Sequence, residues 1–155
     1  GFLSTPFILY VLADMDIEYA YRLLENEEIP GWLSMPKNGA STIWENWEGP
    51  GAGDKAASLN HYSKGAVFQW IFDTMCGIRV DGENHFTIAP RPGGHFTHAK
   101  FSYNSVYGMV VSEWEKKQAG IEFHVTVPAG CTALVRLPDG SERTQDAGVR
   151  IYSVV

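Results

Sequence analysis

The spacing of apolar residues changes near residue 80 of this chain. Before that point apolar residues recur three to four positions apart, as in the stripe from Leu59 to Met75, which is typical of an amphipathic helix. From about residue 84 they alternate with polar residues, as in segment 121–127, which indicates a half-buried antiparallel strand. The sequence therefore predicts a mixed α and β fold with helices and strands in separate segments. We place the boundary between residues 80 and 81.

Three helices are predicted in the first segment. Thr5 as N-cap and Pro6 at the first helical position begin a helix that is apolar nearly all round, so we expect it to be buried on more than one side. Asp16 is the predicted N-cap of the second helix. The third is expected to begin at Ser58 and to end at Gly77.

The second segment predicts a series of short strands separated by Gly, Pro, Asp or Asn. Their expected ranges are 85–88, 98–104, 107–116, 121–127, 131–137 and 149–154. Short strands with turns between them indicate a sandwich or a jelly-roll-like module.

Composition argues against several classes of partner. The 155 residues carry 12 basic and 18 acidic side chains, a net charge of −6, whereas a nucleic-acid partner requires a basic surface. No apolar run reaches the ~18–20 residues that cross a bilayer, so no membrane partner is expected. Cys76 and Cys131 are too few for a disulfide scaffold, and we expect two buried thiols. Aromatic residues make up 13% of the chain, which fits a sugar-binding protein as well as a packed core.

The common motifs for nucleotide binding and for a nucleophilic serine do not occur in this sequence. His95 and His98 lie three positions apart, which places them on opposite faces of a strand, and no cysteine or carboxylate cluster accompanies them. We therefore expect no metal and no cofactor. Glu27 and Glu28 are interpreted as a solvated helix end.

One group of residues indicates chemistry, in the long irregular connection at 30–57, where we also expect a short helix at 41–48. Glu45 stands between Trp44 and Trp47. Apolar surroundings disfavour an ionised carboxylate and so raise its proton affinity. Indole rings pack on the C–H faces of a sugar, and a carboxylate beside them can activate water.

His61 follows this group, in the predicted first turn of the next helix. An imidazole at a helix N-terminus tends to stay neutral and can hydrogen-bond a sugar hydroxyl. The same residues fit a second interpretation, in which Trp44 and Trp47 are core anchors and Glu45 caps a short helix. Spacing alone leaves both open.

A series of motifs extends over most of the chain. They are GFLSTP at 1–6, AYRLL at 20–24, WLSM at 32–35, GASTIWENW at 39–47, SLNHY at 58–62 with GAV at 65–67, and PRPGG at 90–94. In this order they resemble the C-terminal end of bacterial α-L-rhamnosidases of glycoside hydrolase family 78.

The resemblance implies a chain whose residues 1–80 are the last helices of an (α/α)6 catalytic barrel and whose residues 81–155 are an antiparallel, jelly-roll-like β-sandwich. It implies hydrolysis of terminal α-L-rhamnosides with inversion of configuration. The matching motifs make Glu45 the general base and His61 a sugar contact. Trp44, Trp47 and Trp32 match aromatic positions at or near the pocket.

The family's general acid is a Glu in an Asp- and Arg-rich motif earlier in the barrel, and nothing like it occurs here. Inversion needs two carboxylates roughly 6.5–9.5 Å apart, so we expect this chain alone to be inactive. Its expected partners are glycosides that contain L-rhamnose and the missing N-terminal portion of the same polypeptide. A bacterial cytoplasm and a periplasmic or secreted location both remain possible compartments.

Two other functions are compatible with the sequence. A carbohydrate-binding module with a helical cap would hold glycan through aromatic residues on its strands, such as Tyr103, Tyr107 and Trp114. A structural role alone is the other, with residues 84–155 stabilising a barrel. Mutating Trp44 and Trp114 in turn during a sugar titration distinguishes the module from the rhamnosidase.

Overall fold

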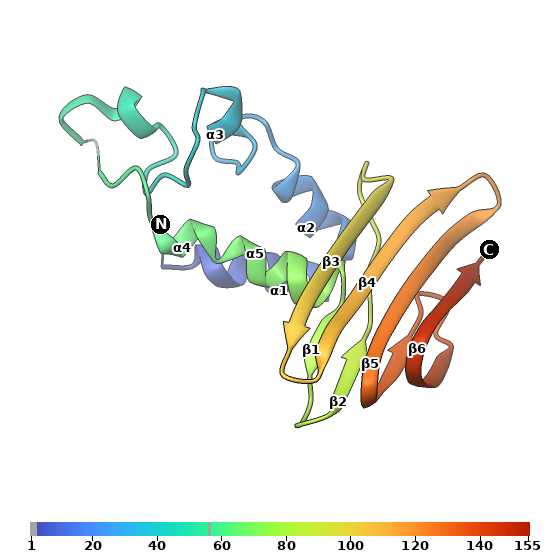
Figure 1. Ribbon diagram of the computed structural model, residues 1–155. Helices are drawn as coiled ribbons and strands as arrows, with labels where there is room; N and C mark the ends of the chain where they lie inside the picture. The colour runs from blue at the N-terminus through green and yellow to red at the C-terminus, as the bar shows by residue number, and fades with distance from the viewer. Residues whose placement is uncertain (1–2, 56) are drawn as a thin grey trace. The chain divides into compact units, whose positions relative to one another are not determined.

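The computed structural model describes residues 3–55 and 57–155. Gly1 and Phe2 of the first motif lie outside the described residues. By its internal contacts the chain divides into two compact units, Gly1–Trp70 and Ile71–Val155. Figure 1 shows helices in the first unit and a sheet in the second, which confirms a mixed fold with the two kinds of element in separate segments.

The first unit is built from short helices. In chain order they are α1 (Thr5–Met15), α2 (Ile17–Leu24), α3 (Ser34–Lys37), the 3-10 segment η1 (Gly49–Lys55), α4 (Tyr62–Gly65) and α5 (Val67–Trp70). Asp16 caps α2 as predicted, since its carboxylate accepts the Glu18 N–H at 3.0 Å. The Tyr21 and Trp70 rings meet edge to face, with centroids 5.3 Å apart, at the centre of this unit.

Three helix predictions for this unit were wrong. Ser4, not Thr5, is the N-cap of α1. The third helix begins at Tyr62 with His61 as its N-cap, and residues 58–60 precede it without helical structure. No helix forms at 41–48, a fully described range, because the Glu45 N–H bonds to the carbonyl oxygen of Ser58 rather than to a preceding helical turn.

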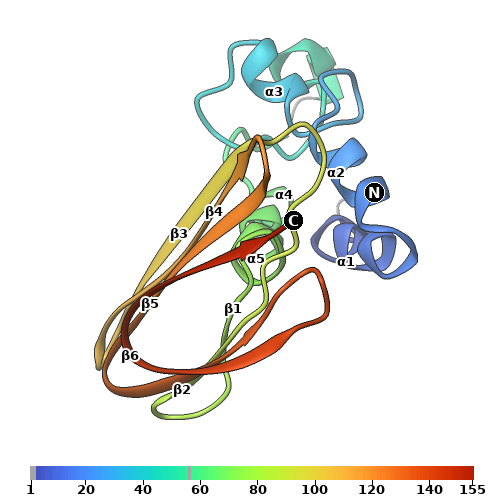
Figure 2. The same ribbon diagram turned by 90° about the vertical axis from the view of Figure 1, so that its right-hand side faces the viewer.

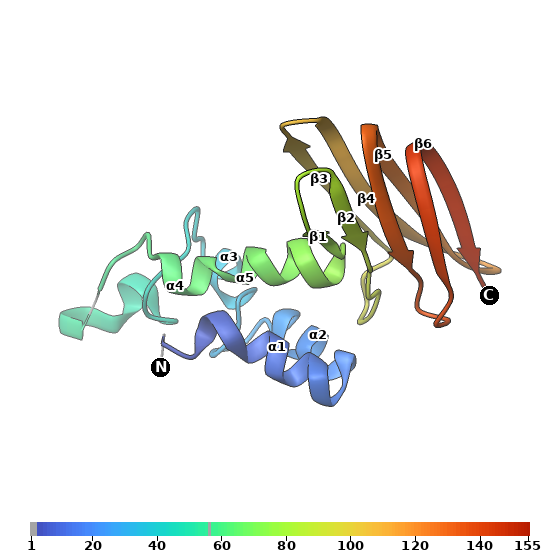
Figure 3. The same ribbon diagram turned by 90° about the horizontal axis from the view of Figure 1, so that it is seen from below.

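Helix α1 is buried on one side only within this unit. Leu9 and Ala13 face its core, and α1 runs beside α4 and α5 (Figure 3). Phe7, Val11 and Met15, spaced four residues apart, are 55–71% exposed. They form an apolar stripe on a second side of α1 that no described element of this unit buries.

The second unit begins with one π-helical segment, η2 (Ile71–Met75), followed by six strands. These are β1 (Ile78–Val80), β2 (His85–Ile88), β3 (His98–Ser105), β4 (Gly108–Lys117), β5 (Gly120–Arg136) and β6 (Glu142–Val154). The hydrogen-bonded order is β1-β2-β5-β4-β3, and β6 pairs with β5. Strand β1 was not predicted, and the segments expected at 121–127 and 131–137 belong to one long strand.

Strand β5 takes part in both halves of the sheet. Its first half pairs antiparallel with β4, and residues 132–135 pair with β2 in parallel, which corrects the fully antiparallel expectation. Strand β6 follows β5 through both halves, with a register shift between Val127 and Thr132. Such an irregularity bends a strand, and Figure 2 shows the sheet curving over itself along β5 and β6.

Alternate side chains of β4 and β5 are buried. Trp114 is fully buried, and its Nε1 donates to the carbonyl oxygen of Met75 at 2.9 Å. Phe123 and Val125 alternate with half-buried Glu122 and His124, as the period-2 pattern predicted. Cys76 and Cys131 are both buried free thiols, which confirms their interpretation. Across residues 3–55 and 57–155, no helix combines the length and apolar sequence that a membrane crossing requires.

Candidate active site

Two segments that flank the η1 loop are joined by main-chain hydrogen bonds. The Glu45 N–H donates to the carbonyl oxygen of Ser58 at 2.8 Å, and the His61 N–H donates to that of Ile43 at 2.8 Å. The Thr42 hydroxyl adds a short bond to the carbonyl oxygen of Leu59. This pairing brings the segment that carries Glu45 against the segment that carries His61, although 15 residues separate them in sequence.

The Glu45 carboxylate is half-buried and held at one oxygen. Its Oε2 accepts the Ser58 N–H at 3.1 Å. An ionised carboxylate has about four lone-pair sites, so one such bond orients the group and leaves it able to accept a proton from water. The short helix that Glu45 was expected to cap does not form at 41–48, and the N–H that Glu45 accepts belongs to Ser58, which lies in no helix.

The three predicted aromatic contacts differ in exposure. Trp44 is 6% and Trp32 5% exposed, so both rings belong to the core of this unit, whereas Trp47 is half-buried. The Trp32 and Trp47 rings meet edge to face at 5.5 Å, and Trp32 Nε1 donates to the carbonyl oxygen of Lys64 at 2.9 Å. Trp44 lies directly against Gly49, where a Cβ would stand 2.1 Å from its ring. The sugar contacts of these tryptophans remain a prediction.

His61 has a defined orientation at the start of α4. Its Nδ1 accepts the Ser63 N–H at 3.3 Å, so in this arrangement Nε2 is the nitrogen that bears the proton. The imidazole stacks on the Tyr62 ring at 5.0 Å and 21°, and Tyr62 is 80% exposed. The sugar contact of His61 remains a prediction.

Lys64 joins this group, and the sequence did not single it out. It is 2% exposed, and its Nζ donates to the carbonyl oxygen of Glu45 and lies 4.0 Å from the centroid of Trp47. Burial lowers the pKa of the Lys64 ammonium, while the Glu48 and Glu45 carboxylates act in the opposite direction. A lone lysine in a polar sequence reads as a surface residue, and no spacing rule would have revealed its position.

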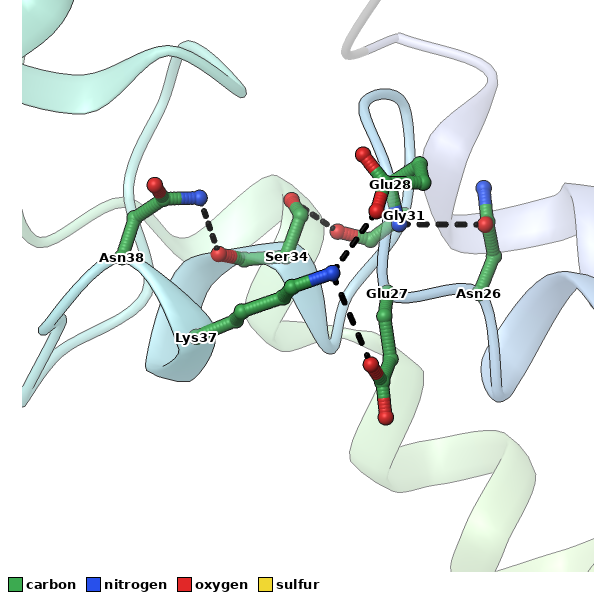
Figure 4. Close-up of polar contacts among 7 residues, drawn as sticks. All are labelled: Asn26, Glu27, Glu28, Gly31, Ser34, Lys37 and Asn38. Atoms are coloured by element: carbon green, nitrogen blue, oxygen red, sulfur yellow. Dashed lines mark hydrogen bonds and ion pairs between the residues drawn. The ribbon is translucent and has the colours of Figure 1, made fainter.

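Side-chain hydrogen bonds connect the residues on both sides of Trp32 in the sequence (Figure 4). The Ser34 hydroxyl donates to the carbonyl oxygen of Gly31 at 2.6 Å, and the Asn38 amide donates to that of Ser34 at 2.7 Å. Lys37 reaches Glu28 at 2.7 Å and Glu27 at 3.6 Å. Both carboxylates are largely exposed, in agreement with their interpretation as solvated.

The histidines and the aromatic residues of the strands give less support for a functional site. Over the part of the chain that the structure describes, no group of three or more His, Cys, Asp or Glu residues is placed to hold a metal ion. His98 pairs with Glu113 at 2.9 Å. Trp114 has no exposed surface, so it cannot offer a ring face to a glycan, and the binding-module interpretation loses one of its three aromatics.

Known proteins match both units of the chain. Residues 1–75 match the family model of the bacterial alpha-L-rhamnosidase 6 hairpin glycosidase domain, and residues 79–150 match that of the bacterial alpha-L-rhamnosidase C-terminal domain. An alpha-L-rhamnosidase of Formosa agariphila is 38% identical over 92% of this chain, and one of Streptomyces avermitilis is 36% identical over 94%.

Solved structures agree with these matches. The Streptomyces avermitilis alpha-L-rhamnosidase, crystallised with L-rhamnose, superposes on 100% of the chain with a TM-score of 0.87 and 30% identity. The Aspergillus terreus enzyme covers 99% with a TM-score of 0.89 and 25% identity. The site residues therefore sit in a domain of the six-hairpin glycosidase class. The chain belongs to the bacterial α-L-rhamnosidase family.

The chain spans a small part of these relatives. It covers 16% of the Formosa agariphila protein and 15% of the Streptomyces avermitilis protein, and 18–19% of the two crystallised chains.

Proposed function

We propose that this chain is the C-terminal part of an α-L-rhamnosidase, which we call the parent enzyme, and that Glu45 is its general base. The observation that carries this proposal is the placement of Glu45. One carboxylate oxygen is oriented by the Ser58 N–H, and the main-chain pairing brings its segment against that of His61. Membership in the rhamnosidase family supplies the substrate class, terminal α-L-rhamnosides.

The proposed reaction is hydrolysis with inversion. Glu45 takes a proton from a water molecule as that water attacks the anomeric carbon, and the leaving oxygen receives a proton from a second carboxylic acid on the opposite side. His61, through Nε2–H, donates to a sugar hydroxyl. The half-buried Trp47 offers apolar surface to the ring.

We further propose that residues 1–80 contain the last helices of an (α/α)6 barrel, and that residues 81–155, together with strand β1 at the end of the first range, form its C-terminal β-sandwich. The exposed stripe Phe7, Val11 and Met15 supports the first part, because apolar side chains at this spacing favour packing against another helix. Preceding barrel helices of the parent enzyme would cover the stripe and carry the general acid.

Two assays test the proposal. The 155-residue chain alone should release no rhamnose from an aryl α-L-rhamnoside, because it lacks the acid. The parent enzyme should release β-L-rhamnose first, as followed by the anomeric proton signals in NMR. Rhamnose release by the isolated chain would contradict the division of the two carboxylates, and initial release of the α-anomer would contradict inversion.

A further inference from the structure

Lys64 is buried to a degree that is unusual for lysine. The residue as a whole is 2% exposed, and its ammonium is partly buried where it meets Glu45. Burying a charge is costly unless it is paired and hydrogen-bonded, so the contacts of this ammonium decide whether the position is favourable. Those contacts are the carbonyl oxygen of Glu45 and the ring of Trp47.

The main chain of Lys64 makes a further connection. Its carbonyl oxygen accepts Trp32 Nε1, and the Trp32 ring meets Trp47 edge to face. Lys64 thus binds Trp47 directly through its ammonium and indirectly through Trp32. A cation is attracted to the face of an indole ring, so this contact favours one position of the Trp47 ring.

Three hydrogen bonds hold the main chain and the side chain of Glu45. Its N–H is held by Ser58, its carbonyl oxygen by Lys64, and its carboxylate by the Ser58 N–H. The first and third bonds come from one residue of the neighbouring segment. The second alone ties the Glu45 carbonyl to α4, the helix that His61 caps.

We infer that Lys64 is a positioning residue of the active site, which holds the Glu45 main chain and the Trp47 ring in the geometry that general-base attack by water requires. This inference rests on the proposed role of Glu45. Lys64 acts through Glu45 and Trp47, so its removal affects kcat more than KM. A shift of about 1 Å in a catalytic group can cost about 100-fold in rate.

Three variants of the parent enzyme test the inference. Lys64→Met keeps the apolar stem and removes the charge and the donor, and Lys64→Arg keeps a charge over Trp47 with a different donor geometry. Lys55→Met is the matched control, since Lys55 is an exposed lysine at the end of η1. We expect kcat to fall about 100-fold in Lys64→Met, with a smaller change in KM, and to be intermediate in Lys64→Arg.

If Lys64 had a purely structural role, its replacement would change stability and not kcat. Replacing a buried charge by an apolar group of similar size is often neutral for stability, so Lys64→Met can remain folded while kcat falls. A kcat for Lys64→Met equal to that of Lys55→Met would overturn the inference. If Lys64→Met does not fold, Lys64→Arg decides alone, and a wild-type kcat in that variant overturns the inference.

Glu45→Gln, measured beside these variants, separates this inference from the proposed function. Loss of turnover in Glu45→Gln, together with a control-like Lys64→Met, would refute the positioning role and leave Glu45 as the base. Wild-type turnover in Glu45→Gln would refute both. The near-UV circular dichroism of Lys64→Met supplies a spectroscopic readout, because a displaced Trp47 changes the tryptophan signal.

Discussion

Replacing Gly49 with alanine tests how closely the Trp44 ring controls the neighbouring Glu45. A Cβ at Gly49 would stand 2.1 Å from one ring carbon of Trp44 and 2.4 Å from two others. Carbon atoms in contact lie about 3.5 Å apart, so the ring must move by about 1.4 Å. Trp44 is buried, so no open solvent is available to take up that displacement.

Two costs add at this position. Gly49 has φ +51°, and an alanine in this left-handed region costs about 1–2 kcal/mol. Overpacking against Trp44 adds about 1–3 kcal/mol. Gly39 is the matched control, because its φ is +82° and a Cβ there meets nothing within 4 Å.

Thermal unfolding followed by tryptophan fluorescence measures the difference, since four of the five tryptophans precede residue 71. With an extra cost of about 2 kcal/mol, Tm should fall roughly 8–16 °C further for Gly49→Ala than for Gly39→Ala in a unit of this size. In the parent enzyme, a displaced segment should also lower kcat by up to about 100-fold. Equal Tm and equal kcat for the two variants would show that the Trp44 ring does not control the position of this segment.

Two further predictions concern the sheet unit. Trp114→Phe removes the bond to the Met75 carbonyl and should lower the free energy of unfolding by about 1–3 kcal/mol in urea titrations, and an unchanged midpoint would contradict this. Burial raises the pKa of the Cys76 thiol to about 12 from 9.0, so the unfolded state loses its proton first. Stability should therefore be complete below pH 9 and decline from there toward pH 12, and Cys76→Ala should remove this decline.

Local structure could be predicted from the sequence where residues close in the chain decide it. The Asp16 cap depends on an N–H two residues away, and strand 85–88 lies between clear turn residues. The predicted helix at 41–48 failed because the hydrogen bonds of this stretch go to residues 58–61. Helix propensity depends on the residues of the segment itself and not on such distant partners.

Distant pairing also explains the errors in the sheet. Strand β1 has three residues and its partner β2 lies beyond a turn, so no periodicity could reveal it. Pro128 and Gly130 suggested a break, yet the strand continues through a register shift. The parallel pairing of β2 with β5 joins residues that are more than 40 positions apart.

The candidate site likewise contains residues that the sequence indicated and one that it did not. The motifs around Glu45 and His61 indicated both residues, and the structure places their two segments against each other. The sequence did not indicate Lys64, because its burial and its bond to the carbonyl oxygen of Glu45 arise only in the folded chain.

The most direct test of Glu45 as the general base is the turnover of an aryl α-L-rhamnoside by the parent enzyme with Glu45→Gln. The control is Glu83→Gln, at an exposed position of the sheet unit. The swap keeps the size of the side chain and removes the base. We predict that kcat falls at least about 100-fold in Glu45→Gln while the folded state persists, and that Glu83→Gln keeps wild-type turnover. Wild-type turnover in Glu45→Gln would contradict the assignment of the general base.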